Sequence, residues 1–346
     1  MIVALILSGF PLRANLVIVP TWDSTITSDP NASSITNTIL QVITLYQASF
    51  SDNVTVSITF AEMSTGLGQS QTFYATGLSY SSIRSKLVAS ATTADDKLAL
   101  AHLPNASTNP VNGSSTMELT LPNGRALGFS GAGWTGSPDG TVWLNTSIMN
   151  LTRTSINPSK YDLYAVAAHE INEVLGLSSS LDGLANGAAA PTGDIDSLDL
   201  FRYDQNGNRS FNTGSASQAY FSLDGMNRLV RYNQDASGDF HDWYSPGGQT
   251  PRVQDAFATA GATPNPTVEM IALDVIGYHF MVPAIAMSKV AANRESLSWS
   301  PVTPGFYVVE STNLLSTNWV ATLNGTNNPV TVTNTVARKF YRMFHP

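Results

Sequence analysis

The chain of 346 residues has no cysteine and few charged side chains. Without cysteine there are no thiol nucleophiles, zinc–thiolate sites, iron–sulfur clusters or disulfides, so any metal must be held by His, Asp or Glu. Charged residues make up 12% of the chain, about half of the roughly 25% of an average soluble protein. Because the net charge is -8 and Lys and Arg form no cluster, we expect no nucleic-acid partner. The apolar fraction of 42% still permits real cores, and the length predicts about two domains.

Long apolar segments are also lacking. Residues 1–14 form an apolar run that ends on a small residue. The run is shorter than the about 20 residues that cross a bilayer, and it is typical of the end of a signal peptide. A buried first strand is the alternative. No other stretch is apolar enough to cross a membrane. With the signal-peptide pattern this predicts a soluble, secreted protein. We also expect it to be a monomer.

Helical and strand patterns alternate over residues 15–280. Apolar residues at helical spacing predict a helix over 35–50, and a clean alternation over 54–60 predicts a strand after it. A second helix is expected over 80–100 and strands over 119–140. The patterns predict an α+β domain.

The character of the chain changes near residue 295. Residues 281–294 are weakly patterned and predict a linker, whereas short strands and polar turns over 295–346 predict a small all-β module. This module resembles fibronectin-like terminal domains of secreted bacterial proteins, which implies a β-sandwich-like fold. The resemblance is carried by Leu297, Trp299, Tyr307, residues 311–314, Asn318, Trp319 and residues 340–342.

The strongest chemical signal lies in a predicted helix over residues 161–177. His169 and Glu173 are four residues apart, so both project from one helix face and can reach one metal ion, as in the HExxH motif. Glu170 lies beside them, where a carboxylate can act as general base toward water acidified by the ion. The second histidine of HExxH is Glu173 here. A solvated helix face is the alternative, but the flanking apolar residues make unpaired charge costly there.

Further motifs follow this helix in a fixed order. They are HEINEVLG at 169–176, LDLFRY at 198–203, YFSLDG at 220–225, GDFHDW at 238–243 and IALDVIGY at 271–278. Over about residues 15–280 the chain thereby resembles secreted bacterial metalloproteases with an HEIxEVLG motif. These are similar to zinc metallopeptidases of the metzincin type, related to leishmanolysin-like enzymes. The resemblance implies a metzincin-like (zincin) domain with an active-site helix, one divalent metal ion, with zinc as the expected ion, and a protein or peptide substrate.

The resemblance also implies a distant third ligand. Matching Trp243 to the tryptophan of the family's Ser-His-Trp segment puts Asp242 at the ligand position and His241 one residue early. Metal chemistry alone favours His241, because imidazole is the better zinc ligand. Carboxylates in place of imidazoles shift the preference toward harder ions, which leaves the identity of the metal open. We expect Trp243 and Phe201 to form part of the wall of the site.

Three other carboxylates are further candidates, at Asp194, Asp196 and Asp199. They could supply the third ligand or a structural calcium site, although acidic loops are commonly just solvated. Residues 254–258 occupy the place of the family's Met-turn without matching it.

These observations predict a secreted, metal-dependent endopeptidase with His169, Glu173 and Asp242 as ligands and Glu170 as general base. One alternative is a catalytically degenerate metallopeptidase fold that acts as a surface-binding or adhesive protein. The other is a metal-dependent hydrolase of sugars or esters. A serine hydrolase fits poorly, since no Gly-x-Ser-x-Gly motif surrounds the serines at 178–180.

Overall fold

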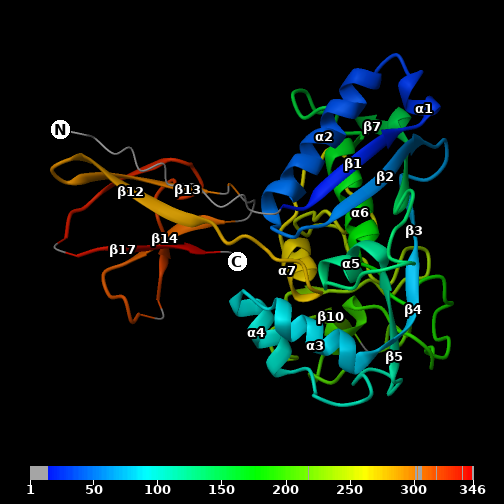
Figure 1. The fold of residues 1–346 in the computed structure, drawn as a ribbon. Helices are drawn as coiled ribbons and strands as arrows, with labels where there is room; N and C mark the ends of the chain where they lie inside the picture. Colours follow the sequence, from blue (N-terminus) through cyan, green and yellow to red (C-terminus); the bar gives the residue numbers. More distant parts are fainter. Residues whose placement is uncertain are drawn as a thin grey trace, which may run out of the picture.

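The protein is a mixed α and β structure, as the sequence patterns predict (Figure 1). The segment 1–14, interpreted above as the end of a signal peptide, lies outside the residues that the structure describes. The computed structural model describes residues 15–216, 218–300, 302, 306–316, 318–336 and 338–344.

A four-stranded sheet carries the site. Its strands are β1 (Val17–Trp22), β2 (Thr55–Glu62), β6 (Gly140–Leu144) and β3 (Gly68–Thr72), in the order β1-β2-β6-β3. The first three run parallel, and β3 pairs antiparallel with β6 at one edge. Side chains alternate along each strand, and in the central strands β2 and β6 every second residue is buried on one face of the sheet.

Two long helices pack together against this sheet. They are α2 (Ala32–Ser49), which contacts β1, and α6 (Leu163–Leu175), which contacts β3 and β6. The predicted apolar alternation after α2 is confirmed, because Val56, Ile58 and Phe60 of β2 are fully buried. The resulting core holds α6, the helix of the chemical motif, in a fixed position.

The sequence sets both ends of α6. The Asp162 side chain accepts the N–H of Ala165, which caps the first turn. Gly176 ends the helix with a φ of 120°, a conformation that favours glycine. In β6, a Cβ on Gly140 would lie 2.7 Å from a methyl group of Val174. The missing side chain therefore lets α6 approach the sheet closely.

The segments around this core differ in two places from the patterns expected. The helix predicted over 80–100 is two helices, because Thr93 and Asp96 form a capping box that starts a new one. The region 119–140, predicted as strand, contains a helix that Thr120 caps. The elements concerned and their neighbours are α1 (Ser24–Thr27), β4 (Tyr74–Ser79), α3 (Tyr80–Ser90), α4 (Ala94–Ala101), β5 (Thr116–Thr120), α5 (Leu121–Ala126), β7 (Met149–Asn150) and β8 (Tyr161–Asp162).

The chain after α6 is mostly loop. A small antiparallel sheet, β11-β10-β9, is followed by helix α7. These elements are β9 (Arg202–Asp204), β10 (Ala219–Phe221), β11 (Val230–Arg231) and α7 (Val268–Val275). The loop between β11 and α7 returns beneath α6, where its Trp243 makes isolated β-bridges to Tyr232 and Asp255.

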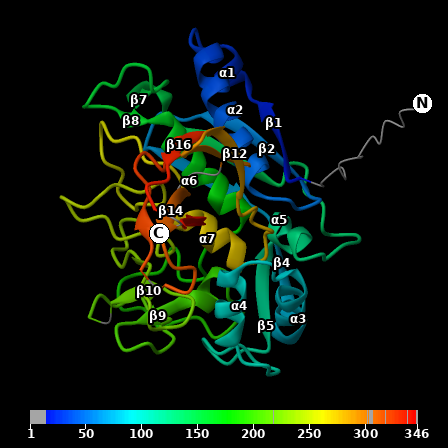
Figure 2. The ribbon, with the colours of Figure 1, turned by 90° about the vertical axis from the view of Figure 1, so that its left-hand side faces the viewer.

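Beyond α7 the described residues form strands and turns, which lie to one side of the main body in Figure 1 and face the viewer in Figure 2. Two three-stranded sheets share one buried cluster that includes Trp299 and Val308. Residues 281–294 were expected to form a linker. Most of them instead form strand β12, which pairs with β13. The strands are β12 (Ala284–Ala291), β13 (Arg294–Ser300), β14 (Tyr307–Ser311), β15 (Val320–Ala321), β16 (Val330–Thr333) and β17 (Phe340–Phe344).

Among the described residues, the helices are all too short or too polar to span a bilayer.

Candidate metal centre

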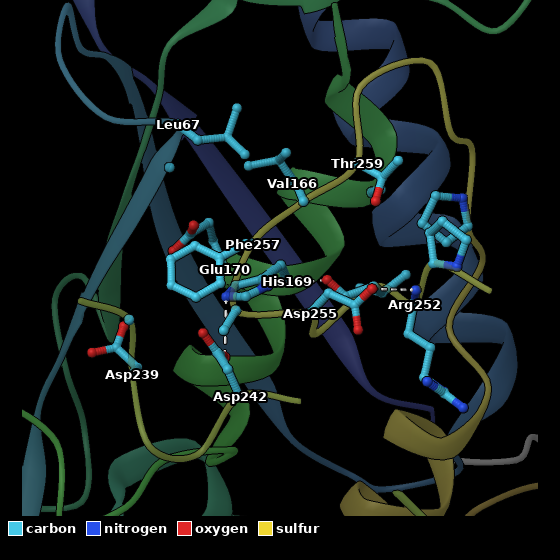
Figure 3. A pocket seen from close by; sticks show the side chains of 18 of the residues that line it. Leu67, Val166, His169, Glu170, Asp239, Asp242, Arg252, Asp255, Phe257 and Thr259 are labelled. Carbon is cyan, nitrogen blue, oxygen red and sulfur yellow. Dashed lines mark hydrogen bonds and ion pairs between the residues drawn. The ribbon is translucent and has the colours of Figure 1, made fainter. Parts of the chain in front are cut away.

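Three predicted ligand residues converge at one point. One ligand atom each of His169, Glu173 and Asp242 lies within 4.8 Å of the other two. His169 Nε2 is 3.2 Å from Glu173 Oε1 and 3.4 Å from Asp242 Oδ1, and Figure 3 shows His169 and Asp242 facing each other. Two ligands each about 2.0 to 2.2 Å from a tetrahedral zinc ion would be about 3.3 to 3.6 Å apart. The donor set therefore fits a single divalent ion.

His241, the alternative third ligand, reaches the same two carboxylates. Its Nε2 lies 3.1 Å from Glu173 Oε1 and 3.3 Å from Asp242 Oδ1, and its Nδ1 lies 2.7 Å from Asp182 Oδ2. A histidine that contacts a carboxylate through its second nitrogen is held in one orientation. The structure thus brings Asp242 and His241 to the same place, and the choice between them stays a prediction.

The other acidic candidates contact a different part of the chain. Asp196 and Asp199 accept hydrogen bonds from the serine hydroxyls at 178–180, in the loop that follows α6. Asp194 accepts the backbone N–H of Gly77. These contacts stabilise the loop and keep the three carboxylates out of the ligand group. A calcium ion bound to them stays a prediction.

Charges in the ligand group influence one another strongly. Burial alone would lower the pKa of His169, but the carboxylates of Asp242 and Glu173 raise it well above its ordinary value. Burial would raise the pKa of Glu173, yet hydrogen bonds from His169 and His241 lower it. Burial raises the pKa of Asp242 to about 6. A divalent cation would compensate this concentration of buried charge.

Contacts from outside the group orient two of the ligands. His169 Nδ1 lies 3.0 Å from the carbonyl oxygen of Val253, which leaves Nε2 facing the other ligands. The Ser70 hydroxyl of β3 donates to Glu173 Oε2 at 2.6 Å. Such outer contacts fix the tautomer and orientation of metal ligands.

A buried chain of amides orients Asp242. The Tyr46 hydroxyl donates to Asn172 Oδ1 at 2.5 Å, and Asn172 Nδ2 donates to Gln254 Oε1 at 2.9 Å. Gln254 Nε2 then donates to Asp242 Oδ1 at 2.9 Å. Helices α2 and α6 and the loop before α7 are thereby connected to one ligand atom. Sequence reasoning missed Asn172 and Gln254, although an asparagine on the apolar side of α6 was a signal for a buried polar contact.

The predicted base, Glu170, lies against β3. Its side chain is 4% exposed and its Oε2 has no hydrogen-bond partner. A Cβ on Gly68 would lie 2.2 Å from Glu170 Oε1, so glycine at this position makes room for the carboxylate. Burial, followed by the nearby charge of Glu173, raises the pKa of Glu170 well above its ordinary value. A buried carboxyl group with a raised pKa is typical of a proton-transferring group.

The ligand group opens into a cavity of about 590 Å³. Residues 66–70, one face of α6, and loop residues between 237 and 264 line it. Trp243 and Phe201, expected in the wall of the site, are instead fully buried in an aromatic cluster with Phe221 and do not line the cavity. The Trp243 indole donates to Glu269 at 2.9 Å, so it anchors the loop that carries Asp242.

No protein-family model matches the chain, and neither a curated protein nor a solved structure matches it. We therefore base the functional proposal on the geometry of the site.

Proposed function

We propose that this protein is a secreted, metal-dependent endopeptidase with a metzincin-like catalytic domain and a small C-terminal β-module. One observation carries the proposal. Ligand atoms from α6 and from a loop 69 residues after Glu173 meet within 4.8 Å of one another, in the wall of a cavity that Glu170 also lines.

His169, Glu173 and Asp242 would hold the ion. Two carboxylates and one imidazole give the centre more negative charge than three imidazoles would, so a divalent cation is favoured there. A divalent ion bound in such a site polarises a carbonyl group and acidifies water. Zinc is the ion that we expect, because all three residue types are competent zinc ligands.

Glu170 would move the proton. Its carboxylate accepts a proton from the water whose oxygen attacks the peptide carbonyl carbon. The same group then delivers this proton to the departing amide nitrogen as the C–N bond breaks. A raised pKa suits this double role, because a carboxyl group with a higher pKa is the better proton acceptor.

The edge strand favours a peptide as substrate. Strand β3 pairs with β6 on one side and is the last strand of its sheet, and its residues Gly68 to Ser70 line the cavity. An extended peptide can pair with such an edge through backbone hydrogen bonds. A sugar or an ester has no backbone to match it.

The proposal is tested by cleavage of an unfolded protein by the purified full-length chain. We expect cleavage that is lost after removal of metal by a chelator and restored by added zinc. Glu170→Gln keeps the size of the side chain but cannot accept a proton, so activity should fall about 10²-fold or more while the metal is retained. Full activity in Glu170→Gln, or after complete removal of metal, would refute the proposal.

A further inference from the structure

We infer that Glu269 is a positioning residue of the metal centre, because its carboxylate holds together the two loop segments that set the places of Asp242 and His169. The inference rests on the metal centre of the proposed function and adds to it a residue outside the ligand group. It is carried by N–H groups that converge on one buried side chain from different parts of the loop.

Glu269 lies in the first turn of α7 and is 0% exposed. Its Oε1 accepts the indole N–H of Trp243 at 2.9 Å and the backbone N–H of Gln254 at 3.1 Å. Its Oε2 accepts the backbone N–H of Thr267 at 2.8 Å, where the helix begins. Both oxygens of this carboxylate are therefore used as acceptors inside the core.

The contact with the indole holds the segment that carries Asp242. Trp243 follows Asp242 directly in the chain and is fully buried. Its ring packs against Phe221 and Tyr232, and its N–H is held by Glu269. Because neighbouring residues are joined by one planar peptide group, a fixed Trp243 restricts the positions open to Asp242.

The contact with the backbone fixes a peptide group that also meets His169. The peptide group between Val253 and Gln254 has its N–H on Glu269 and its carbonyl oxygen 3.0 Å from His169 Nδ1. A peptide group is planar, so it cannot turn away from the carboxylate without turning away from the imidazole as well. The side chain of Gln254 in turn donates to Asp242 Oδ1 at 2.9 Å. One carboxylate oxygen thereby supports the outer contacts of two ligands.

Three donors of this kind require a carboxylate. An ionised carboxyl group accepts on both oxygens and has no donor, whereas an amide of the same shape has one acceptor oxygen and one donor amino group. Glu269→Gln would therefore bring an N–H group against the N–H of Thr267 or against those of Trp243 and Gln254. Either arrangement displaces at least one of the two loop segments from the place that it now has.

The inference is tested by metal binding to the full-length Glu269→Gln variant. Competition with a chromophoric chelator gives its zinc affinity, which we expect to fall about 10- to 100-fold. Cobalt(II), added alone as a probe, has an absorption spectrum that reports the arrangement of its ligands. We expect the spectrum at saturating cobalt to differ in shape from that of the wild type. A loss of stability alone would leave that shape unchanged.

The matched control is Asp274→Asn. Asp274 is 1% exposed and lies in the same helix, but it accepts the Thr93 hydroxyl and the backbone N–H of Phe280. These contacts join α7 to the start of α4 and to the chain after the helix, so this variant should keep the zinc affinity and the cobalt spectrum of the wild type. Equal weakening of zinc binding in Asp274→Asn and Glu269→Gln would overturn the inference, because the effect would then be one of overall stability.

A second variant serves if Glu269→Gln does not fold. Trp243→Phe keeps an aromatic ring in the core and removes the indole N–H, so one of the two contacts with Oε1 is lost. We expect its zinc affinity to fall about tenfold and its cobalt spectrum to change. Wild-type affinity and spectrum in Glu269→Gln, or in Trp243→Phe where the first variant is unfolded, would overturn the inference.

These measurements need no cleavage, which separates the inference from the proposed function. If the wild type binds zinc but cleaves no protein, the peptidase proposal fails, and the metal measurements still decide the role of Glu269. If the wild type binds neither zinc nor cobalt, the metal centre and this inference are both refuted.

Discussion

Alanine substitutions at Asp242 and His241 discriminate between the two neighbouring candidates for the third ligand. Asp242 Oδ1 belongs to the ligand group, whereas His241 Nε2 contacts the carboxylates and its Nδ1 contacts Asp182. We therefore expect Asp242→Ala to remove a direct ligand, and His241→Ala to remove a contact that orients ligands.

The two losses differ in size. Structural zinc sites bind with about 10 to 16 kcal/mol, so one of three ligands contributes about 4 kcal/mol, and Asp242→Ala should weaken metal binding about 10³-fold. Loss of an orienting contact typically weakens it by about 10- to 100-fold. His241→Ala should therefore still bind metal in the presence of a modest excess.

Competition with a chromophoric zinc chelator measures both affinities. Thermal melting without metal serves as the control, because it shows whether either variant is unfolded rather than deficient in binding. If Asp242→Ala binds metal tightly and His241→Ala does not, the ligand is His241 and the match to the family's tryptophan is wrong by one residue.

Three further predictions concern single side chains. His169→Ala should lose the ion and the stability that the ion adds, so its melting temperature should no longer rise with added zinc; a rise equal to that of the wild type would contradict its role as ligand. Gly68→Ala places a Cβ 2.2 Å from Glu170 Oε1, so kcat should fall about 10²-fold with metal retained, and wild-type kcat would show that Glu170 need not occupy that position. His279 Nδ1 lies 2.7 Å from Asp52, a contact that raises the pKa of His279. The stabilisation from this pair is therefore complete below the unfolded pKa of about 6.5 and is lost as the pH rises through the folded pKa. Urea denaturation should show His279→Gln less stable by about 0.5 to 1 kcal/mol at pH 5 and nearly neutral at pH 9, and an equal loss at both pH values would contradict the ion pair.

Local patterns predicted the parts of the fold that local physics determines. The alternation in β2 and the apolar spacing in α2 follow directly from which side chains face the core. The break between α3 and α4 was missed because a capping box at Thr93 outweighs the continuous helical pattern. Strand β12 was missed because most of its side chains are exposed, so its sequence lacks an apolar alternation.

That His169 and Glu173 lie together could be predicted because they share one helix turn, and the structure brings Asp242 to them. The residues that orient them could not, since Gln254 meets Asn172 across 82 residues of sequence and Asp182 meets His241 across 59. Trp243 was misplaced for a related reason. A tryptophan beside a ligand suggested a cavity wall, but its indole N–H finds a buried acceptor in Glu269 and the ring turns into the core.

The most direct test of the proposed metal centre is the metal content of the purified full-length protein, measured by mass spectrometry beside that of the Glu173→Ala variant. We expect about one divalent ion per wild-type chain and almost none per variant chain, because the variant lacks one of the three ligands. The same metal content in both proteins, or no metal in the wild type even after incubation with excess zinc, would contradict the assignment of these ligands.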